Sequence, residues 1–74
     1  MKTYVEVYVS ADGEKASVIT EKLLELGLKT TIGEHDFVYN WKDDLIITEV
    51  LKFVDRIQSK LKGSGAILKF STFK

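Results

Sequence analysis

The stretch Asp36-Phe37-Val38-Tyr39-Asn40-Trp41 decides the fold that this sequence predicts. Its three aromatic residues alternate, so in an extended chain they all point to one face. Gly33-Glu34-His35 precedes the stretch as a turn, and Lys42-Asp43-Asp44 follows it as the start of a helix. We therefore predict an inner strand of a small sheet over about residues 36–41.

The clearest strand outside this stretch runs from Thr3 to Ser10. It alternates strictly between β-branched valines on one face and amphipathic residues on the other. The first set is Val5, Val7 and Val9, and the second is Tyr4, Glu6 and Tyr8. We expect the valine face to pack on helices and the other face to look outward.

Two further segments alternate in the same way. The first runs from Leu28 to Ile32, with Leu28, Thr30 and Ile32 inward, and the second runs from Ala66 to Phe73, with Ala66, Leu68 and Phe70 on one face. The short link at residues 33–35 predicts that the strands on either side of it pair antiparallel.

Two segments have apolar residues at helical spacing. The first helix is predicted over about 13–26, with Asp12 as its N-cap and Gly27 as its left-handed C-cap residue. The second is capped by Asp43 or Asp44 and runs to about Lys62, before Gly63-Ser64-Gly65. Its apolar series is Ile47, Val50, Val54, Ile57 and Leu61.

The predicted order of elements is therefore βαββαβ. Right-handed crossovers then give an α+β fold, the ferredoxin-like plait, with a four-stranded antiparallel sheet in the order 4-1-3-2. We expect one domain over residues 1–74, with both helices on one face of the sheet and the other face bare.

Composition limits the possible functions. The 74 residues include no cysteine, which excludes disulfides and thiolate sites, and no proline. Eleven basic and eleven acidic residues cancel, so a binder of the phosphate backbone is not expected. Because no apolar run approaches the ~20 residues of a membrane span and no signal peptide is evident, we expect a cytoplasmic protein without a membrane partner.

The bare face raises the question of where the aromatics point. We favour Phe37, Tyr39 and Trp41 outward, beside Tyr4 and Tyr8, although facing the helices is the alternative. An outward aromatic face suits self-association, and an interface of that kind suits a pocket for a flat heterocycle. Base stacking on single-stranded RNA is disfavoured by acidic residues among the aromatics.

The polar residues near the turn carry weaker signals. We interpret His35, Asp36 and Glu34 as part of a solvated hairpin. An acid–base or metal cluster is the less favoured alternative, because neighbouring strand residues point to opposite faces. Nothing in the sequence resembles a nucleophile paired with a base, so we expect no enzyme, no cofactor and no metal site.

Two family resemblances follow from the spacing of these motifs. From Leu26-Gly27-Leu28-Lys29 through Ile32-Gly33 to the second helix, the chain resembles the small thiamine-binding-like proteins of archaea and bacteria. That resemblance implies an oligomer with sheet packed on sheet that binds thiamine or a related pyrimidine. It departs at the end of the third strand, where the family tends to carry Glu-Gly and this chain has Asn40-Trp41.

The second resemblance is to the stand-alone effector-binding domain of Lrp/AsnC regulators. Ile32-Gly33-Glu34-His35-Asp36-Phe37 is similar to its Gly-x-x-Asp motif, although Leu26 to Gly33 is shorter than the usual second strand. This resemblance implies a dimer or larger ring that binds amino acids between subunits.

We therefore predict a non-enzymatic homodimer or tetramer that binds a small molecule, thiamine or a related pyrimidine, near its sheet interface. The predicted ligand-binding residues are Trp41, Tyr39, Asn40, His35 and Asp36. The predicted oligomer interface is formed by Tyr4, Glu6, Tyr8 and Phe37. The alternatives are an amino-acid effector domain and a structural or protein-interaction module without a ligand.

Overall fold

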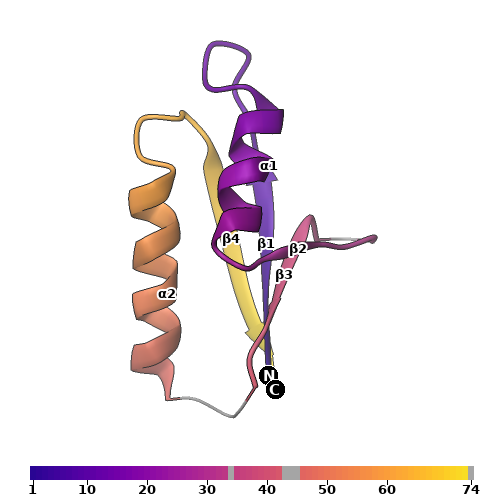
Figure 1. The fold of residues 1–74 in the computed structure, drawn as a ribbon, viewed down its shortest axis with the longest axis vertical. Helices are drawn as coiled ribbons and strands as arrows, with labels where there is room; N and C mark the ends of the chain where they lie inside the picture. Colours follow the sequence, from indigo (N-terminus) through magenta and orange to yellow (C-terminus); the bar gives the residue numbers. More distant parts are fainter. Residues whose placement is uncertain (34, 43–45, 74) are drawn as a thin grey trace.

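The computed structural model of this chain describes residues 1–33, 35–42 and 46–73. Its elements are β1 (Lys2–Tyr8), α1 (Ala16–Glu25), β2 (Lys29–Thr30), β3 (Phe37–Asn40), α2 (Ile47–Lys60) and β4 (Ile67–Phe73), as Figure 1 shows. They form one four-stranded sheet in the order β2-β3-β1-β4, which is the predicted order read from the other edge. The prediction of an α+β fold with an antiparallel sheet is confirmed.

Strand β1 lies in the middle of the sheet and sets the register of its neighbours. It pairs with β4 over seven residues, from Lys2 opposite Phe73 to Tyr8 opposite Ile67. It pairs with β3 over four residues, of which Val5 lies opposite Phe37. The two chain ends meet at one end of the sheet because β1 and β4 run antiparallel side by side (Figure 1).

One hydrophobic core lies between the sheet and the two helices. Every core residue of the three longer strands belongs to the face that carries Val5, and both helices contribute to the same cluster, so both cover that one face. The buried members of the cluster are Val5, Ile19, Leu23, Leu28, Phe37, Phe53, Ile57 and Leu61. The opposite face has no helix over it among the described residues (Figure 1).

The favoured orientation of the third strand is wrong. Phe37 is only 6% exposed and Tyr39 packs against the core, because they lie opposite Val5 and Thr3 of the helix-covered face. Trp41, just past the strand, joins them. The rings of Tyr39 and Trp41 lie 4.4 Å and 5.3 Å from that of Phe53 on α2, between ring centres. The rings of Tyr39 and Trp41 therefore extend the core beside Phe53.

Helix α1 begins later than predicted and is not capped by Asp12. Lys15 occupies the N-cap position without a side-chain hydrogen bond. The preceding turn is instead held by the loop after α2, since the Glu14 amide donates to the Ser64 carbonyl at 2.9 Å. A Cβ on Gly13 would lie 2.4 Å from that carbonyl oxygen. This close backbone approach explains the glycine and keeps residues 12–14 out of the helix.

The predicted end of α1 at Gly27 is confirmed. Gly27 has a φ of +95°, and its amide donates to the Leu24 carbonyl at 3.0 Å. The Leu28 amide reaches back to the Leu23 carbonyl at 3.3 Å, and both leucines are buried. This pair of hydrogen bonds and the apolar contact beside it form a Schellman motif, which turns the chain into β2.

The remaining boundaries differ in detail. β2 is only Lys29–Thr30, so the predicted inward Ile32 is fully exposed. β1 ends at Tyr8, which leaves Val9 exposed. α2 begins at Ile47 after Ile46 at the N-cap, and the predicted caps Asp43 and Asp44 lie outside the described residues.

Candidate binding surface on the open face of the sheet

The side of the sheet without helices is called the open face below. The register places on it every β1, β3 and β4 residue that alternates with the core positions. The open face consists of Lys2, Tyr4, Glu6 and Tyr8 from β1, Val38 and Asn40 from β3, Ile67, Lys69, Ser71 and Phe73 from β4, and the adjoining His35. Tyr8, Ile67 and Phe73 are 53%, 66% and 55% exposed. This surface therefore combines apolar rings with both signs of charge.

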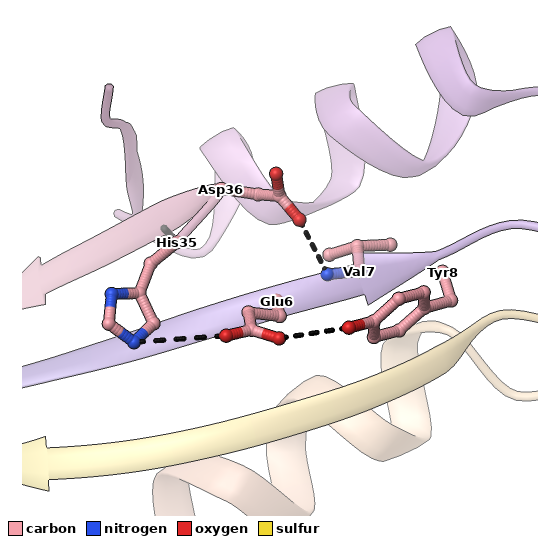
Figure 2. A network of polar contacts seen from close by, with 5 residues as sticks. All are labelled: Glu6, Val7, Tyr8, His35 and Asp36. Atoms are coloured by element: carbon pink, nitrogen blue, oxygen red, sulfur yellow. Dashed lines mark hydrogen bonds and ion pairs between the residues drawn. The ribbon is translucent and has the colours of Figure 1, made fainter. Parts of the chain in front are cut away.

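Glu6 is the centre of a polar network on this surface. Figure 2 shows its carboxylate between His35 and Tyr8, in front of β1 and on the side away from the helices. The Tyr8 hydroxyl donates to Oε2 of Glu6 at 3.1 Å, and Nε2 of His35 lies 3.9 Å from Oε1. The latter contact is an ion pair only when His35 is protonated. One carboxylate thus organises two ring side chains.

Tyr4 extends this network into an aromatic surface. Its ring lies 4.7 Å from the His35 ring, between centroids, at an interplanar angle of 32°. Phe73 of β4 meets it edge-on, with centroids 5.9 Å apart at 61°. Both distances lie in the range of favourable ring pairs. The open face therefore holds a row of rings beside a carboxylate, from His35 in the turn before β3, from Tyr4 in β1 and from Phe73 in β4.

The charge on Glu6 affects Tyr8 directly. The hydrogen bond to Glu6, and next the negative charge of that carboxylate, raise the pKa of the Tyr8 phenol above its ordinary value of 10.0. The phenol is therefore a stable donor at neutral pH, and it holds Glu6 in place for a further donor.

Asp36 is used by the sheet itself. Its Oδ2 accepts from the Val7 amide at 2.8 Å, and its own amide donates to the Val5 carbonyl at 3.1 Å, as Figure 2 shows for the side-chain bond. Asp36 thus extends the pairing between β1 and β3 by one residue before β3 begins at Phe37. Its place here fits a role in holding the sheet together and positioning the neighbouring His35.

The predicted ligand residues are not brought together in one place. Trp41 and Tyr39 lie on the helix-covered side, and the indole Nε1 of Trp41 donates to Oγ1 of Thr3 at 2.8 Å. Asn40 is exposed on the open face at the far end of β3 from His35 and Asp36. A single pocket lined by all five residues is therefore not present, and the stacking surface expected from Trp41 is part of the core.

Of the predicted interface residues, Tyr4, Glu6 and Tyr8 lie on the open face, whereas Phe37 lies in the core. Two exposed residues of this face, Ile67 and Phe73, were missed by the sequence reasoning. The signal for them was present. They alternate with Leu68 and Phe70, so assigning those two to the core also assigns Ile67 and Phe73 to the open face.

Other possible sites are less developed. A cavity of about 250 Å³ lies between the end of α2 and β4, and a shallower one of about 440 Å³ lies beside α2 and the end of α1. Neither is lined by a residue of the open face. Over residues 1–33, 35–42 and 46–73 no group of three His, Asp or Glu residues could hold a metal ion. No helix in the described part of the chain is long and apolar enough to cross a membrane.

Comparisons with protein-family models, with curated proteins and with solved structures found no match to this chain. The geometry of the open face is therefore the basis for a functional argument.

Proposed function

We propose that this chain is a homo-oligomeric binding module of the ferredoxin-like type, which binds a flat, positively charged heterocycle on its open face. Thiamine or a related pyrimidine is the ligand class, in line with the first family resemblance. The observation that supports the proposal is the set of rings from Tyr4, His35, Tyr8 and Phe73 around the Glu6 carboxylate.

The chemistry of these groups suits such a ligand. Ring side chains attract a cation placed over their faces, and they stack on a flat heterocycle. The Glu6 carboxylate can accept from an exocyclic amino group or compensate a positive ring nitrogen. Because Glu6 already accepts from Tyr8, its position is set before a ligand arrives, which lowers the entropic cost of binding.

Self-association would complete the site. A standard interface covers about 800 Å² of each partner, which is roughly 15% of the 5215 Å² accessible surface of this chain. Exposed Ile67, Tyr8 and Phe73 supply apolar area for it. Glu6 lies opposite Lys69 in the register, so a second copy related by a two-fold axis can present each charge to its opposite.

The test is a calorimetric titration of the protein with thiamine. We expect binding that weakens at least about tenfold in Glu6→Gln, which corresponds to the loss of one charge-assisted contact. Glu49→Gln is the matched control. It makes the same chemical change on α2, away from the open face. Equal affinity of the two variants for thiamine would show that Glu6 is not part of the site.

The same titration separates the remaining possibilities. Amino acids titrated in parallel test the second resemblance, and binding of an amino acid without binding of thiamine would replace the ligand class. A stable oligomer that binds neither would leave a protein-interaction module. A protein that stays monomeric at every concentration would overturn the oligomeric part of the proposal.

A further inference from the structure

The outer edge of β4 is long and poorly protected. β4 is an edge strand in the sheet order of the described residues, and its ladder with β1 runs through all seven residues without interruption. Natural edge strands are usually shortened, bulged, or interrupted by proline and charges. Here Lys69 is the only charged residue in Ile67–Phe73, and the chain contains no proline. An edge of this kind is able to accept another strand.

We infer that β4 pairs antiparallel with β4 of a second copy of this chain, with Phe70 on the two-fold axis. In this register Ile67 lies opposite the partner's Phe73, and Lys69 lies opposite the partner's Ser71. The two four-stranded sheets then form one continuous sheet of eight strands. The new strand pair satisfies the backbone groups of the β4 edge and covers its exposed side chains.

The side chains of β4 select this register. Ile67 and Phe73 are both exposed on the open face, and the pairing places each against the other at both ends of the interface. Centring the axis on Lys69 would place two lysines opposite each other, which is unfavourable. Centring it on Ser71 would place Lys69 opposite Phe73. Only the axis at Phe70 places an apolar side chain opposite an apolar one at both ends and leaves the Lys69 ammonium opposite the hydroxyl of Ser71.

The helix-covered side of β4 supports the same partner. The cavity of about 250 Å³ beside β4 has a mixed lining, in which Gln58, Lys62 and the glycines at 63 and 65 accompany Leu61 and three half-buried residues of the β4 side, Ala66, Leu68 and Phe70. In the inferred register the partner's Phe70 lies beside Phe70 on this side, and the partner's Thr72 lies opposite Leu68. The second copy therefore packs against incompletely covered core residues as well as against the strand edge.

This interface differs from the one in the proposed function, although Ile67 and Phe73 take part in both. It uses the edge of the sheet and leaves the centre of the open face free, so either association can form without the other. If both form, the assembly is a tetramer built from two eight-stranded sheets packed face to face.

Engineered cysteines test the register, because the chain has none of its own. The experiment mixes Ile67→Cys protein with Phe73→Cys protein under mild oxidation and measures cross-linked dimer by non-reducing electrophoresis and mass spectrometry. Directly opposite residues have Cα atoms about 4.5–5.5 Å apart, within disulfide range. We expect efficient cross-linking in this mixture. Both positions are exposed, so the variants should fold.

Two controls make the result specific. Each single variant alone should form little cross-linked dimer. In this register the two copies of residue 67 are separated by six residues, or about 20 Å. A mixture of Ile67→Cys with Ser71→Cys should also stay uncross-linked, since that pair requires the axis at Lys69. Equal cross-linking in the first mixture and in all of the controls, or none in the first mixture, would overturn the inference.

Carrying out these reactions in a Val38→Glu background separates the two interfaces. Val38 lies on the open face of β3, two strands away from β4, so a charge there opposes face-to-face packing and leaves the edge intact. Persistence of the selective cross-link in this background supports edge pairing whatever becomes of the proposed function. Its disappearance would assign the contact to the open face and overturn edge pairing.

A pair of charge variants gives an independent measurement. Ser71→Glu places a carboxylate opposite the partner's Lys69 at two symmetric positions, and Ser71→Lys places a second ammonium there. In the Val38→Glu background, sedimentation equilibrium should show a dimer about tenfold tighter for Ser71→Glu than for Ser71→Lys. Equal dissociation constants, or a monomer in both variants, would contradict the register. Binding of an added extended peptide to the β4 edge, without pairing of β4 between two copies, would also contradict the inference.

Discussion

The two faces of this sheet carry similar numbers of ring side chains, but the rings differ in burial. On the helix-covered face Phe37 is 6% exposed, and Tyr39 and Trp41 pack edge-on at 4.8 Å, between ring centres. On the open face Tyr8 and Phe73 are more than half exposed. Aromatic content therefore does not distinguish core from surface in a chain this small. The register to a strand of known orientation does, because it assigns every residue of a paired strand to one face.

The polar groups differ between the faces in the same way. Thr3 is fully buried, and its hydroxyl oxygen contacts both Trp41 at 2.8 Å and Thr72 at 2.9 Å. On the open face Glu6 and Tyr8 interact in contact with water. Buried hydrogen bonds contribute to stability chiefly because breaking them leaves unsatisfied groups, whereas exposed groups return to water. Polar groups on the covered face therefore stabilise the fold, and those on the open face remain available to a ligand.

The largest expected difference between the faces is in the effect of removing a phenylalanine ring. Phe53→Ala should lose about 3–5 kcal/mol of unfolding free energy, which equals the whole stability expected for a domain of this size. Phe73→Ala, which removes the same ring from the open face, should lose less than about 1 kcal/mol at protein concentrations low enough to keep the chain monomeric. Urea denaturation, monitored by circular dichroism, measures the unfolding free energy of both variants.

If Phe53→Ala does not fold at all, Phe53→Leu keeps the comparison measurable. It should lose roughly 1–2 kcal/mol, which is still more than Phe73→Ala. Equal losses at the two positions in the monomeric protein would mean that Phe73 is covered by other parts of the same chain, which would contradict the comparison.

Removing a hydroxyl should give a smaller difference of the same sign. Thr3→Val keeps the shape of a buried side chain but leaves the indole of Trp41 without its acceptor, so it should cost about 1–3 kcal/mol. Tyr8→Phe removes an exposed hydroxyl and should change the unfolding free energy by less than about 0.5 kcal/mol. Denaturant midpoints at fixed protein concentration provide the measurement, and a larger effect at Tyr8 would reverse the comparison.

The smallest expected effect is on the titration of Tyr8. Its pKa is raised in the folded chain by the hydrogen bond to Glu6 and by that carboxylate's charge. The neutral phenol is the form that the folded state favours, so the resulting stabilisation is present below the unfolded pKa and is lost as pH rises through the folded one. Phenolate absorbance should show the Tyr8 pKa fall towards 10.0 in Glu6→Gln. An unchanged titration would mean that the Tyr8–Glu6 contact is absent in solution.

Much of the fold followed from period and turn signals. The strict alternation of residues 3–10, the helical spacing after Ile47 and the glycine at position 27 are local features, and each predicted an element that is present. The boundary of α1 could not be predicted in this way. It depends on Ser64, a residue far along the chain whose carbonyl meets the turn at Gly13.

The candidate site was predicted only in part. The outward position of Tyr4, Glu6 and Tyr8 followed from the alternation of one strand, and it is correct. The position of Trp41 was wrong, because the alternation of aromatics in β3 has no direction of its own. The two faces exchange when a strand turns over, and only pairing with β1 shows which face is inside.

The sequence by itself determined the kinds of elements, their order and the composition of each strand face, since these depend on neighbours within a few residues. The tertiary structure alone decided which face of β3 is buried and that His35 of the turn comes to lie beside Tyr4 and Glu6 of β1. These outcomes depend on contacts between residues distant in the chain, whose energies arise only when the sheet has assembled in one register.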